Sequence, residues 1–274
     1  NRRLRPTSVR AGGRFRLAKP GRCGYASCDH PLPSMTDLLQ NPIFYAVAIP
    51  AVVLIGLSKG GFGGALGVVG VPLMALAMPP VQAAAILLPI LVLMDIAALW
   101  AWRKADRDWQ TFRNLIPGAI VGIGIGWLTA AMVTEAAVKL IVGLIAFGFV
   151  LRWFWQKYAG REKAHGHNPV AGVFWGAVSG FTSFVAHAGG PPYQVYTLPL
   201  RQDPKLYTAT SVVFFAVVNA VKLIPYFALG ELGTGNLVAA GALMPVAFLA
   251  TVAGAAVVKR MRAEIFYPIT YALV

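Results

Sequence analysis

The sequence predicts an all-α fold: a polytopic helical membrane protein. Of its 274 residues, 57% are hydrophobic and 12% are charged, whereas soluble domains contain about 25% charged residues. Four stretches carry almost no charge, and each approaches the roughly 20 residues that a helix needs to cross a bilayer. They are residues 82–102, 114–133, 137–155 and 236–257. Because these stretches do not alternate between polar and apolar residues, they argue against a β-barrel.

Residues 1–34 form a basic leader that differs from the rest of the chain. The leader carries +7 of the formal charge of +14. It lacks the apolar core of a secretory signal, so we expect either upstream sequence before a natural start at Met35 or a basic tail at the membrane surface. Both cysteines, Cys23 and Cys28, lie here beside His30. This is a weak zinc pattern, and we predict no metal and no cofactor.

The basic residues after Met35 are distributed unevenly among the connections between apolar stretches. Most lie in residues 103–113, 152–163, 201–205 and 259–262, whereas the connections around 78–82, 130–136 and 230–235 contain none. By the positive-inside rule, the basic connections face the cytoplasm. We therefore expect a multi-pass protein of the cell inner membrane, in contact with the lipid bilayer. Because the charge belongs to the leader and to loops at the membrane surface, we predict no nucleic acid partner.

Two polar, glycine-rich segments interrupt the apolar sequence at residues 58–72 and 179–192. Lipid cannot satisfy the backbone groups that such a break exposes, so the break must be buried in protein or line a cavity. If the spans alternate in direction, the stretch 43–79 begins and ends outside and the stretch 168–200 begins and ends inside. Each stretch is then a hairpin bent at its break. Paired breaks of this kind indicate the substrate site of a transporter.

The two hairpins predict an inverted repeat of two halves, residues 35–160 and 161–274. Each half contains a broken or re-entrant hairpin followed by three transmembrane helices. The halves align at residues 70–72 with 190–192, at Asp95 with Asn219, and at Pro117 and Gly126 with Pro245 and Gly254. Residues 137–155 should then match 265–283. Since the chain stops at Val274, we expect its last helix to be truncated.

Three motifs around the breaks carry a resemblance to a known family. They are the glycine run 60–70 closed by Pro72, the Gly-Gly-Pro-Pro turn at 189–192, and Ala-Thr-Ser at 209–211 before a span with Asn219 and Lys222. Over about residues 43–274, the chain resembles the sulfite exporter TauE/SafE family of membrane permeases. The first half departs from the second by having Ala-Ala-Ala-Ile at 83–86, and so offers fewer hydroxyl groups to a ligand. The resemblance implies movement of small sulfur-containing anions, such as sulfite or organosulfonates, across the inner membrane.

An anion near the membrane midplane needs hydrogen-bond donors, which unwound glycine backbone and helix N-termini can supply. The alternative is that the small residues only let helices pack closely. For Gly118, Gly122 and Gly126, which recur at a spacing of four, close packing is the better interpretation. The predicted donors are the glycines of the two breaks: Gly60, Gly61, Gly63, Gly64, Gly189 and Gly190.

Two lysines lie within apolar sequence, where an ionised side chain is expensive and indicates function. Lys59, at the first break, is predicted to attract the anion, with snorkelling to an interface as the alternative. Lys222 lies one turn after Asn219 on the same helix face, and Thr210 and Ser211 begin that helix. These four residues are predicted to form a polar wall of the substrate site, or alternatively a polar patch that bridges helices.

Asp95 and His187 are the candidate proton-coupling residues. Asp95 is predicted either to pair with Lys59 or Lys222 or to carry a proton. His187 lies at the second break, where it is predicted to contact the substrate, and histidine titrates near neutral pH. His165 and His167 lie in a basic loop and are expected to be solvated. The tryptophans near the basic connections are predicted interfacial anchors: Trp100, Trp102, Trp109, Trp153 and Trp155.

The predicted function is a secondary transporter that moves small, sulfur-containing anions by alternating access, with the substrate between the two breaks. A passive anion channel built on the same halves is the alternative. A membrane-embedded enzyme using Ser183, His187 and Asp95 is disfavoured because no signature fixes their order, so no enzymatic activity is expected. The glycines near Lys59 do not form a nucleotide-binding loop. The anion, its direction of movement, proton coupling and homo-oligomerisation stay open.

Overall fold

In a computed structural model of the chain, the described residues form helices and no strands. The structure describes residues 40–130 and 166–272, with a few helical positions between 136 and 155. The leader 1–34 and most of the predicted span 137–155 therefore lie outside the described residues. Within the described residues, six helices are long and apolar enough to cross a membrane. They are α2 (Pro42–Gly61), α4 (Pro80–Ala101), α5 (Trp109–Ala130), α7 (Pro169–Ala186), α9 (Pro204–Ala228) and α10 (Thr234–Arg260).

Shorter elements connect or follow these helices. They are α3 (Gly67–Met74), α8 (Gly190–Thr197), the 3-10 turn η1 (Leu198–Leu200) and α11 (Ala263–Ala272). The predicted all-α, polytopic membrane fold is confirmed, and the chain is a multi-pass membrane protein. The inverted repeat in its sequence stays a prediction.

Three of the long helices begin with the same local signal. The side chain of Asn41 accepts a hydrogen bond from Ile43 N at the start of α2, and Asn168 and Asp203 cap α7 and α9 in the same way. Each capping residue is followed by a proline at the first helical position. The cap satisfies an otherwise free backbone N–H, and proline has no N–H to satisfy. The local sequence therefore determines where these three helices begin.

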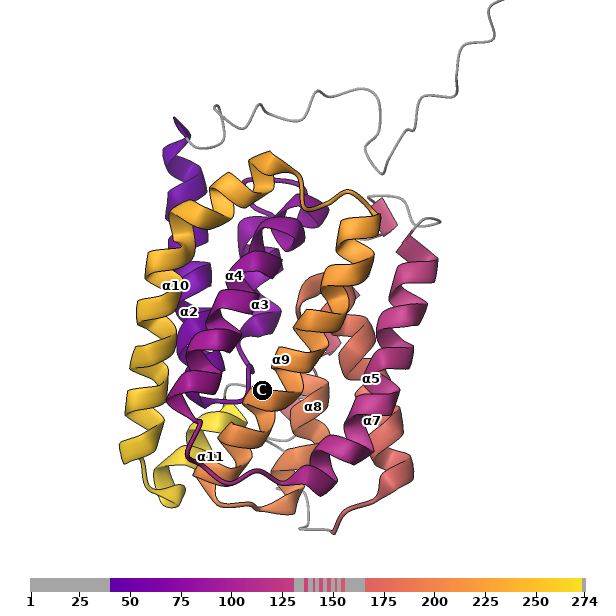
Figure 1. The fold of residues 1–274 in the computed structure, drawn as a ribbon, viewed down its shortest axis with the longest axis vertical. Coiled ribbons are helices and arrows are strands. Elements are labelled where there is room, and N and C mark those ends of the chain that lie inside the picture. The colour runs from indigo at the N-terminus through magenta and orange to yellow at the C-terminus, as the bar shows by residue number, and fades with distance from the viewer. Residues whose placement is uncertain are drawn as a thin grey trace, which may run out of the picture.

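Two close helix pairs form opposite sides of the molecule, α2 with α10 and α5 with α7, and α4 and α9 lie between them (Figure 1). Glycines allow the close approach. A Cβ atom on Gly60 of α2 would lie 2.1 Å from Thr251 O of α10, and one on Gly118 of α5 would lie 1.9 Å from Val173 O of α7. The packing interpretation of Gly118, Gly122 and Gly126 is confirmed, since a Cβ on any of them would overlap α7.

The contacts in each pair advance in the same direction along both chains, so the paired helices run parallel. On α5 and α7, Gly118 meets Val173 and Gly122 meets Ala177; on α2 and α10, Gly56 meets Ala250, and Gly61 of the same helix meets Val258 further along. A parallel pair cannot be joined by a short turn, so each pair is assembled from distant parts of the chain. One predicted half contributes α2 and α5 and the other contributes α7 and α10.

Each predicted hairpin has one long arm and one short arm. In the first, α2 continues to Gly61, the chain turns over residues 62–66, and α3 returns for only eight residues. In the second, α7 ends at Ala186 and α8 begins at Gly190. The two long arms enter from opposite ends of the molecule, α2 from the top of Figure 1 and α7 from the bottom.

Much of the outer surface of the helices is apolar, while three charged side chains of the spans are buried in the interior. Lys59, Asp95 and Lys222 are each at most 6% exposed. A soluble protein rarely exposes so much contiguous apolar surface, so this arrangement fits a lipid surrounding. Large apolar side chains that are at least two-thirds exposed include Leu76, Leu128, Val170, Phe227 and Leu249.

Candidate functional site

The two breaks meet inside the molecule. A Cβ atom on Gly190 would lie 2.1 Å from Gly64 O, and one on Gly67 would lie 2.8 Å from His187 O. Gly63 and Gly64 have positive φ values of 62° and 73°, a conformation that favours glycine. His187 ends α7 at a φ of 53°, also in the left-handed region. The glycines at this junction thus allow the turn and the close backbone contact between the two hairpins.

Side chains from other helices satisfy the carbonyl groups that the first break exposes. Trp102 Nε1 donates to Gly60 O, Thr208 Oγ1 to Gly61 O, and Gln194 Nε2 to Phe62 O, each at 2.8 Å. Helix ends buried away from water require such partners. The prediction that Trp102 is an interfacial anchor is therefore wrong, because its side chain is 2% exposed and caps a helix. Trp100 and Trp109 are exposed.

Backbone N–H groups are less available at the breaks than the sequence suggests. Ser58 engages three of them, accepting from Phe62 N (2.6 Å) and Gly64 N (3.3 Å) at its carbonyl oxygen and from Leu66 N (3.0 Å) at its hydroxyl. At the second break, the prolines at positions 191 and 192 have no N–H to donate. The breaks therefore offer fewer backbone donors to a bound anion than their glycine content suggests.

The predicted site glycines are divided between packing and the cavity. Gly60 and Gly61 press against α10, where added Cβ atoms would lie 2.1 Å from Thr251 O and 2.3 Å from Val258 Cγ2. Gly189 accepts a hydrogen bond at its carbonyl from Ser179 Oγ (2.7 Å). A Cβ on Gly63 would lie 2.5 Å from the hydroxyl of Tyr207. Gly64 and Gly190 line a small cavity at the junction of the breaks.

Four polar side chains line this cavity. Lys59 comes from α2, Asn219 from α9, Ser183 from α7, and His187 from the second break. Apolar walls complete the cavity: Ile55, Leu91 and Phe215. The structure therefore brings together side chains from both predicted halves, at the place where the two breaks meet.

Lys59 and Asn219 share Asp95 as a partner. Lys59 Nζ lies 2.8 Å from Asp95 Oδ1, and Asn219 Nδ2 donates to Asp95 Oδ2 at 2.6 Å. Of the two alternatives for Asp95, pairing with Lys59 is the one that the geometry shows. An ammonium group has three N–H donors and a primary amide has two. Within the described part of the chain no other hydrogen bond engages either group, so both keep donors for a ligand.

Lys222 lies behind the cavity wall and is fully buried. Its Nζ contacts Ser183 O at 3.0 Å, Ser183 Oγ at 2.9 Å and His187 Nδ1 at 2.8 Å. His187 Nε2 lies 2.8 Å from Ala84 O. Because a carbonyl oxygen can only accept, Nε2 carries the proton and Nδ1 accepts from Lys222. These contacts fix the neutral tautomer of His187.

Tyr226 of α9 also contacts the end of α7 and the His187 ring. Its hydroxyl donates to Phe184 O at 2.8 Å, and its ring stacks on the His187 ring with centroids 6.1 Å apart. Together with Lys222 on Ser183 O, it caps the carbonyl end of α7. The second break is thus capped by α9, as the first is capped by α4, α8 and α9 side chains.

Thr210 and Ser211 lie away from the cavity, although they belong to the same helix as Asn219. Thr210 Oγ1 donates to Leu206 O at 2.7 Å and accepts from Asp108 N at 2.8 Å. Ser211 Oγ donates to Thr208 O at 2.8 Å. Ser183 takes the place expected for them, a residue that the sequence indicated only through the enzyme alternative. Its proximity to the Gly189–Gly190 break was the available signal.

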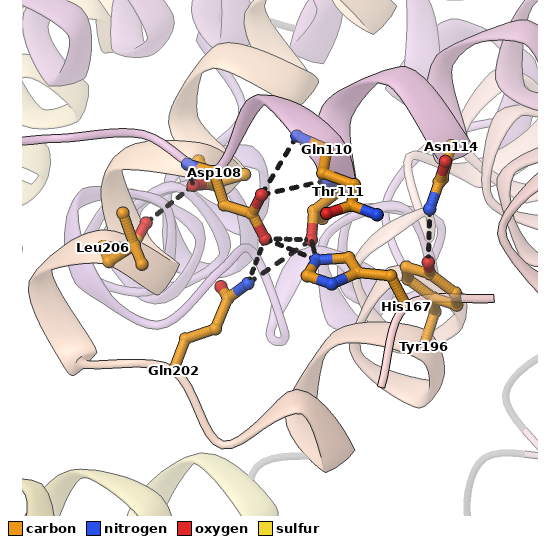
Figure 2. A network of polar contacts seen from close by, with 9 residues as sticks. Asp108, Gln110, Thr111, Asn114, His167, Tyr196, Gln202 and Leu206 are labelled. Atoms are coloured by element: carbon orange, nitrogen blue, oxygen red, sulfur yellow. Dashed lines mark hydrogen bonds and ion pairs between the residues drawn. The ribbon is translucent and has the colours of Figure 1, made fainter. Parts of the chain in front are cut away.

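A second polar cluster lies at the end of the molecule where α5 begins (Figure 2). Asp108 Oδ1 caps α5, accepting from Gln110 N (3.0 Å) and Thr111 N (3.2 Å). Its Oδ2 accepts from Thr111 Oγ1 (2.6 Å) and contacts His167 Nε2 (2.7 Å) and Gln202 Nε2. The expectation that His167 is solvated is wrong, because the side chain is 25% exposed and paired with Asp108.

The electrostatics of this cluster favour the ionised carboxylate. Burial alone would raise the pKa of Asp108, but the hydrogen bonds from Thr111 and His167 outweigh it and lower the pKa below its ordinary value. Asp108 is therefore ionised. Through its contacts with Thr111, His167 and Gln202, it joins α5 to the segment before α7 and to the turn before α9.

Comparison with known proteins assigns the chain to a family. A family model described as "Sulfite exporter TauE/SafE" matches residues 48–274. Neither the curated proteins nor the solved structures contain a match. The match includes both breaks, the cavity and every long helix beyond the first turns of α2. The chain therefore belongs to the sulfite exporter TauE/SafE family of membrane transporters, and it is a transporter rather than an enzyme.

Proposed function

We propose that this protein is a secondary transporter that moves small, sulfur-containing anions across the inner membrane by alternating access. The observation that carries the proposal is the cavity between the two breaks, on which a lysine, an amide and a hydroxyl converge. Broken helices that meet inside a bilayer are typical of transporter substrate sites. The family description supports the sulfur-containing class of substrate.

In this proposal the anion is bound by side chains. Lys59 Nζ, Asn219 Nδ2 and the Ser183 hydroxyl lie on the cavity wall and donate to substrate oxygens. Such charge-assisted hydrogen bonds are stronger than neutral ones. Lys222 stays behind Ser183 and His187 and contributes positive charge. Thr210 and Ser211 are not part of the proposed binding set.

The two close helix pairs are the proposed moving parts. Lys59 belongs to the α2–α10 pair, and Ser183 belongs to the α5–α7 pair. Rocking of one pair against the other would open the cavity alternately to the two sides of the membrane while each pair stays rigid. His187 and Asp95 are the proposed proton-coupling residues, since they are the titratable partners of Lys222 and Lys59.

Uptake into proteoliposomes tests the proposal. The full chain is reconstituted, a pH gradient is imposed, and entry of radiolabelled sulfite is measured with methanesulfonate as competitor. We expect saturable uptake that accumulates sulfite above its external concentration. Lys59→Gln should reduce uptake at least about tenfold, because losing a charged hydrogen bond at a binding site costs about 1.5–3 kcal/mol.

Lys205→Gln is the matched control, because Lys205 is an exposed lysine in the first turn of α9. It should transport as the unmodified protein does. Uptake that never exceeds the external concentration would support the channel alternative, and the absence of uptake of any sulfur-containing anion would refute the proposed substrate class.

A further inference from the structure

The interior of the described bundle contains an odd number of full charges. Among the described residues, the buried side chains that carry a full charge are Lys59, Asp95 and Lys222. All three lie at or directly behind the cavity, together with neutral His187. Lys59 and Asp95 form one ion pair at 2.8 Å and cancel. Lys222 contacts two oxygens and a ring nitrogen, none of which carries a negative charge.

The contacts of Lys222 match those of an ammonium ion. It has three acceptors within 3.0 Å, one for each N–H of an ammonium group. One acceptor is His187 Nδ1, which has no proton of its own because Nε2 donates to Ala84 O. With Lys222 as an ammonium, the cavity and its charged neighbours have a net charge of +1.

We infer that the cavity selects anions of a single negative charge. This inference rests on the proposed function and names the charge class of its substrate. A monoanion, such as hydrogensulfite or an alkylsulfonate, would make the buried cluster neutral. A dianion, such as sulfite or sulfate, would leave one unpaired negative charge in a buried site, which is strongly unfavourable.

Desolvation acts in the same direction. The cost of moving an ion into a low-dielectric site grows with the square of its charge, so a dianion loses roughly four times the hydration free energy of a similar monoanion. The rest of the cavity wall is apolar, formed by Ile55, Leu91 and Phe215. Within the described residues, no third lysine or arginine is buried to repay that cost.

The test uses two anions of similar size and shape but different charge. Methanesulfonate is a monoanion and sulfate a dianion throughout the pH range near neutrality, so neither changes charge during the measurement. Each is tested as an inhibitor of radiolabelled sulfite uptake into proteoliposomes, with ionic strength held constant. Methyl sulfate, which has four oxygens and one charge, controls for the difference between a methyl group and an oxygen.

The unmodified protein should be inhibited by methanesulfonate and methyl sulfate at concentrations about tenfold or more below that of sulfate, because one unpaired charge near the site costs more than 1.4 kcal/mol. Equal or stronger inhibition by sulfate would overturn the inference while leaving the proposed transport intact. Absence of sulfite uptake altogether would instead count against the proposed function.

Two substitutions change the charge of the cluster in opposite directions. Asp95→Asn keeps the shape of the side chain and raises the net charge to +2, so inhibition should shift toward sulfate by about tenfold or more. Lys222→Gln lowers the net charge to zero and should weaken inhibition by both anions. If Asp95→Asn fails to fold, the measurement on the unmodified protein decides alone. An unchanged ratio in a folded Asp95→Asn protein would also overturn the inference.

Discussion

His187 combines three contacts that depend on one another. Its left-handed backbone ends α7, Nε2 donates to Ala84 O, and Nδ1 accepts from Lys222. Nδ1 can bind a proton only when the Lys222 ammonium moves away, because both cannot place a proton in the same 2.8 Å gap. An anion that attracts Lys222 would release Nδ1. This exchange would couple one proton to one anion, with Lys59 and Asp95 as the other charged groups nearby. The proton would raise the net charge of the cluster by one, so the selection for a single negative charge applies to the state in which His187 is neutral.

Replacement of His187 tests this exchange. His187→Asn should abolish accumulation driven by a pH gradient, because asparagine cannot bind a proton there. Exchange of internal for external sulfite at equal pH should continue, since Lys59, Asn219 and Ser183 are unchanged. Asparagine also tolerates the left-handed backbone at this position. Both activities are measured in the same proteoliposomes, and full pH-driven accumulation by His187→Asn would leave Asp95 as the proton carrier.

The Lys59–Asp95 pair predicts a stability effect that is separate from transport. Asp95→Ala leaves a buried lysine without its counter-charge, which should lower the free energy of unfolding by about 3–5 kcal/mol. The double substitution Lys59→Met, Asp95→Asn removes both charges and should recover most of that loss. Chemical unfolding in detergent measures the difference. Asp106→Ala, at an exposed aspartate, is the control and should be neutral within about 0.5 kcal/mol. Equal stability of the single and double variants would contradict the predicted effect.

At the scale of the helices, glycine spacing decides which surfaces touch. On α5, Gly122 faces α7, where an added Cβ would lie 2.0 Å from Ala177 O, whereas Gly124 has no atom within 4 Å of its Cβ position. Two positions of one helix thus differ only in their orientation. Packed helices cannot move apart locally without losing contacts along the whole seam.

These two glycines form a matched pair of substitutions. Gly122→Ala should destabilise the protein by about 1–3 kcal/mol, the usual cost of overpacking. Gly124→Ala should be neutral or stabilising by up to about 1 kcal/mol, because alanine is the better helix former. Thermal unfolding in detergent compares them. Equal midpoints for the two variants would argue against the α5–α7 pairing.

The junction of α5, α7 and α9 at Asp108 should respond to acid. Because the pKa of Asp108 in the folded protein is lowered, below the unfolded value of about 3.9, its contribution to stability is complete above that value. The contribution is lost as pH falls through the lower, folded pKa. Asp108→Ala removes the α5 cap and should cost about 1 kcal/mol at pH 7. The difference from the unmodified protein should shrink only in strong acid, and a difference that already disappeared near pH 6 would contradict this account.

The helices and their breaks could be predicted because their signals are local. Hydropathy, the Asn-Pro and Asp-Pro starts and the glycine-rich breaks all act within a few residues. Partners are set by helices distant in sequence, so the choice of Lys59 rather than Lys222 for Asp95, and of Ser183 rather than Ser211 for the cavity, required the structure. The capping roles of Trp102 and Thr208 were hidden for the same reason. The packing role of Gly60 and Gly61 depends likewise on α10.

At the scale of the whole molecule, the basic connections that the structure describes lie at one end. Lys259 Nζ, at the end of α10, donates to Ala101 O at the end of α4 (2.6 Å), and Gln202 joins the turn before α9 to Asp108. In Figure 1 these ends lie at the bottom, and the turn between α9 and α10 lies at the top. The basic connections of the described residues lie at this end, which predicts that it faces the cytoplasm.

Labelling of introduced cysteines tests this orientation. Cys23 and Cys28 are first replaced by serine, and single cysteines are then placed at Lys104, Lys205 or Gly233, all of them exposed positions. In spheroplasts, a membrane-impermeant maleimide should label Gly233→Cys before lysis, and Lys104→Cys and Lys205→Cys only after it. The reverse pattern would place the Asp108 cluster outside and exchange the two sides of the membrane in the proposed transport cycle. With the expected pattern, α7 and the second break enter from the cytoplasm and α2 and the first break from outside. The cavity residues Lys59 and Ser183 would then belong to hairpins that enter the membrane from opposite sides. Alternating access between the two helix pairs requires this arrangement.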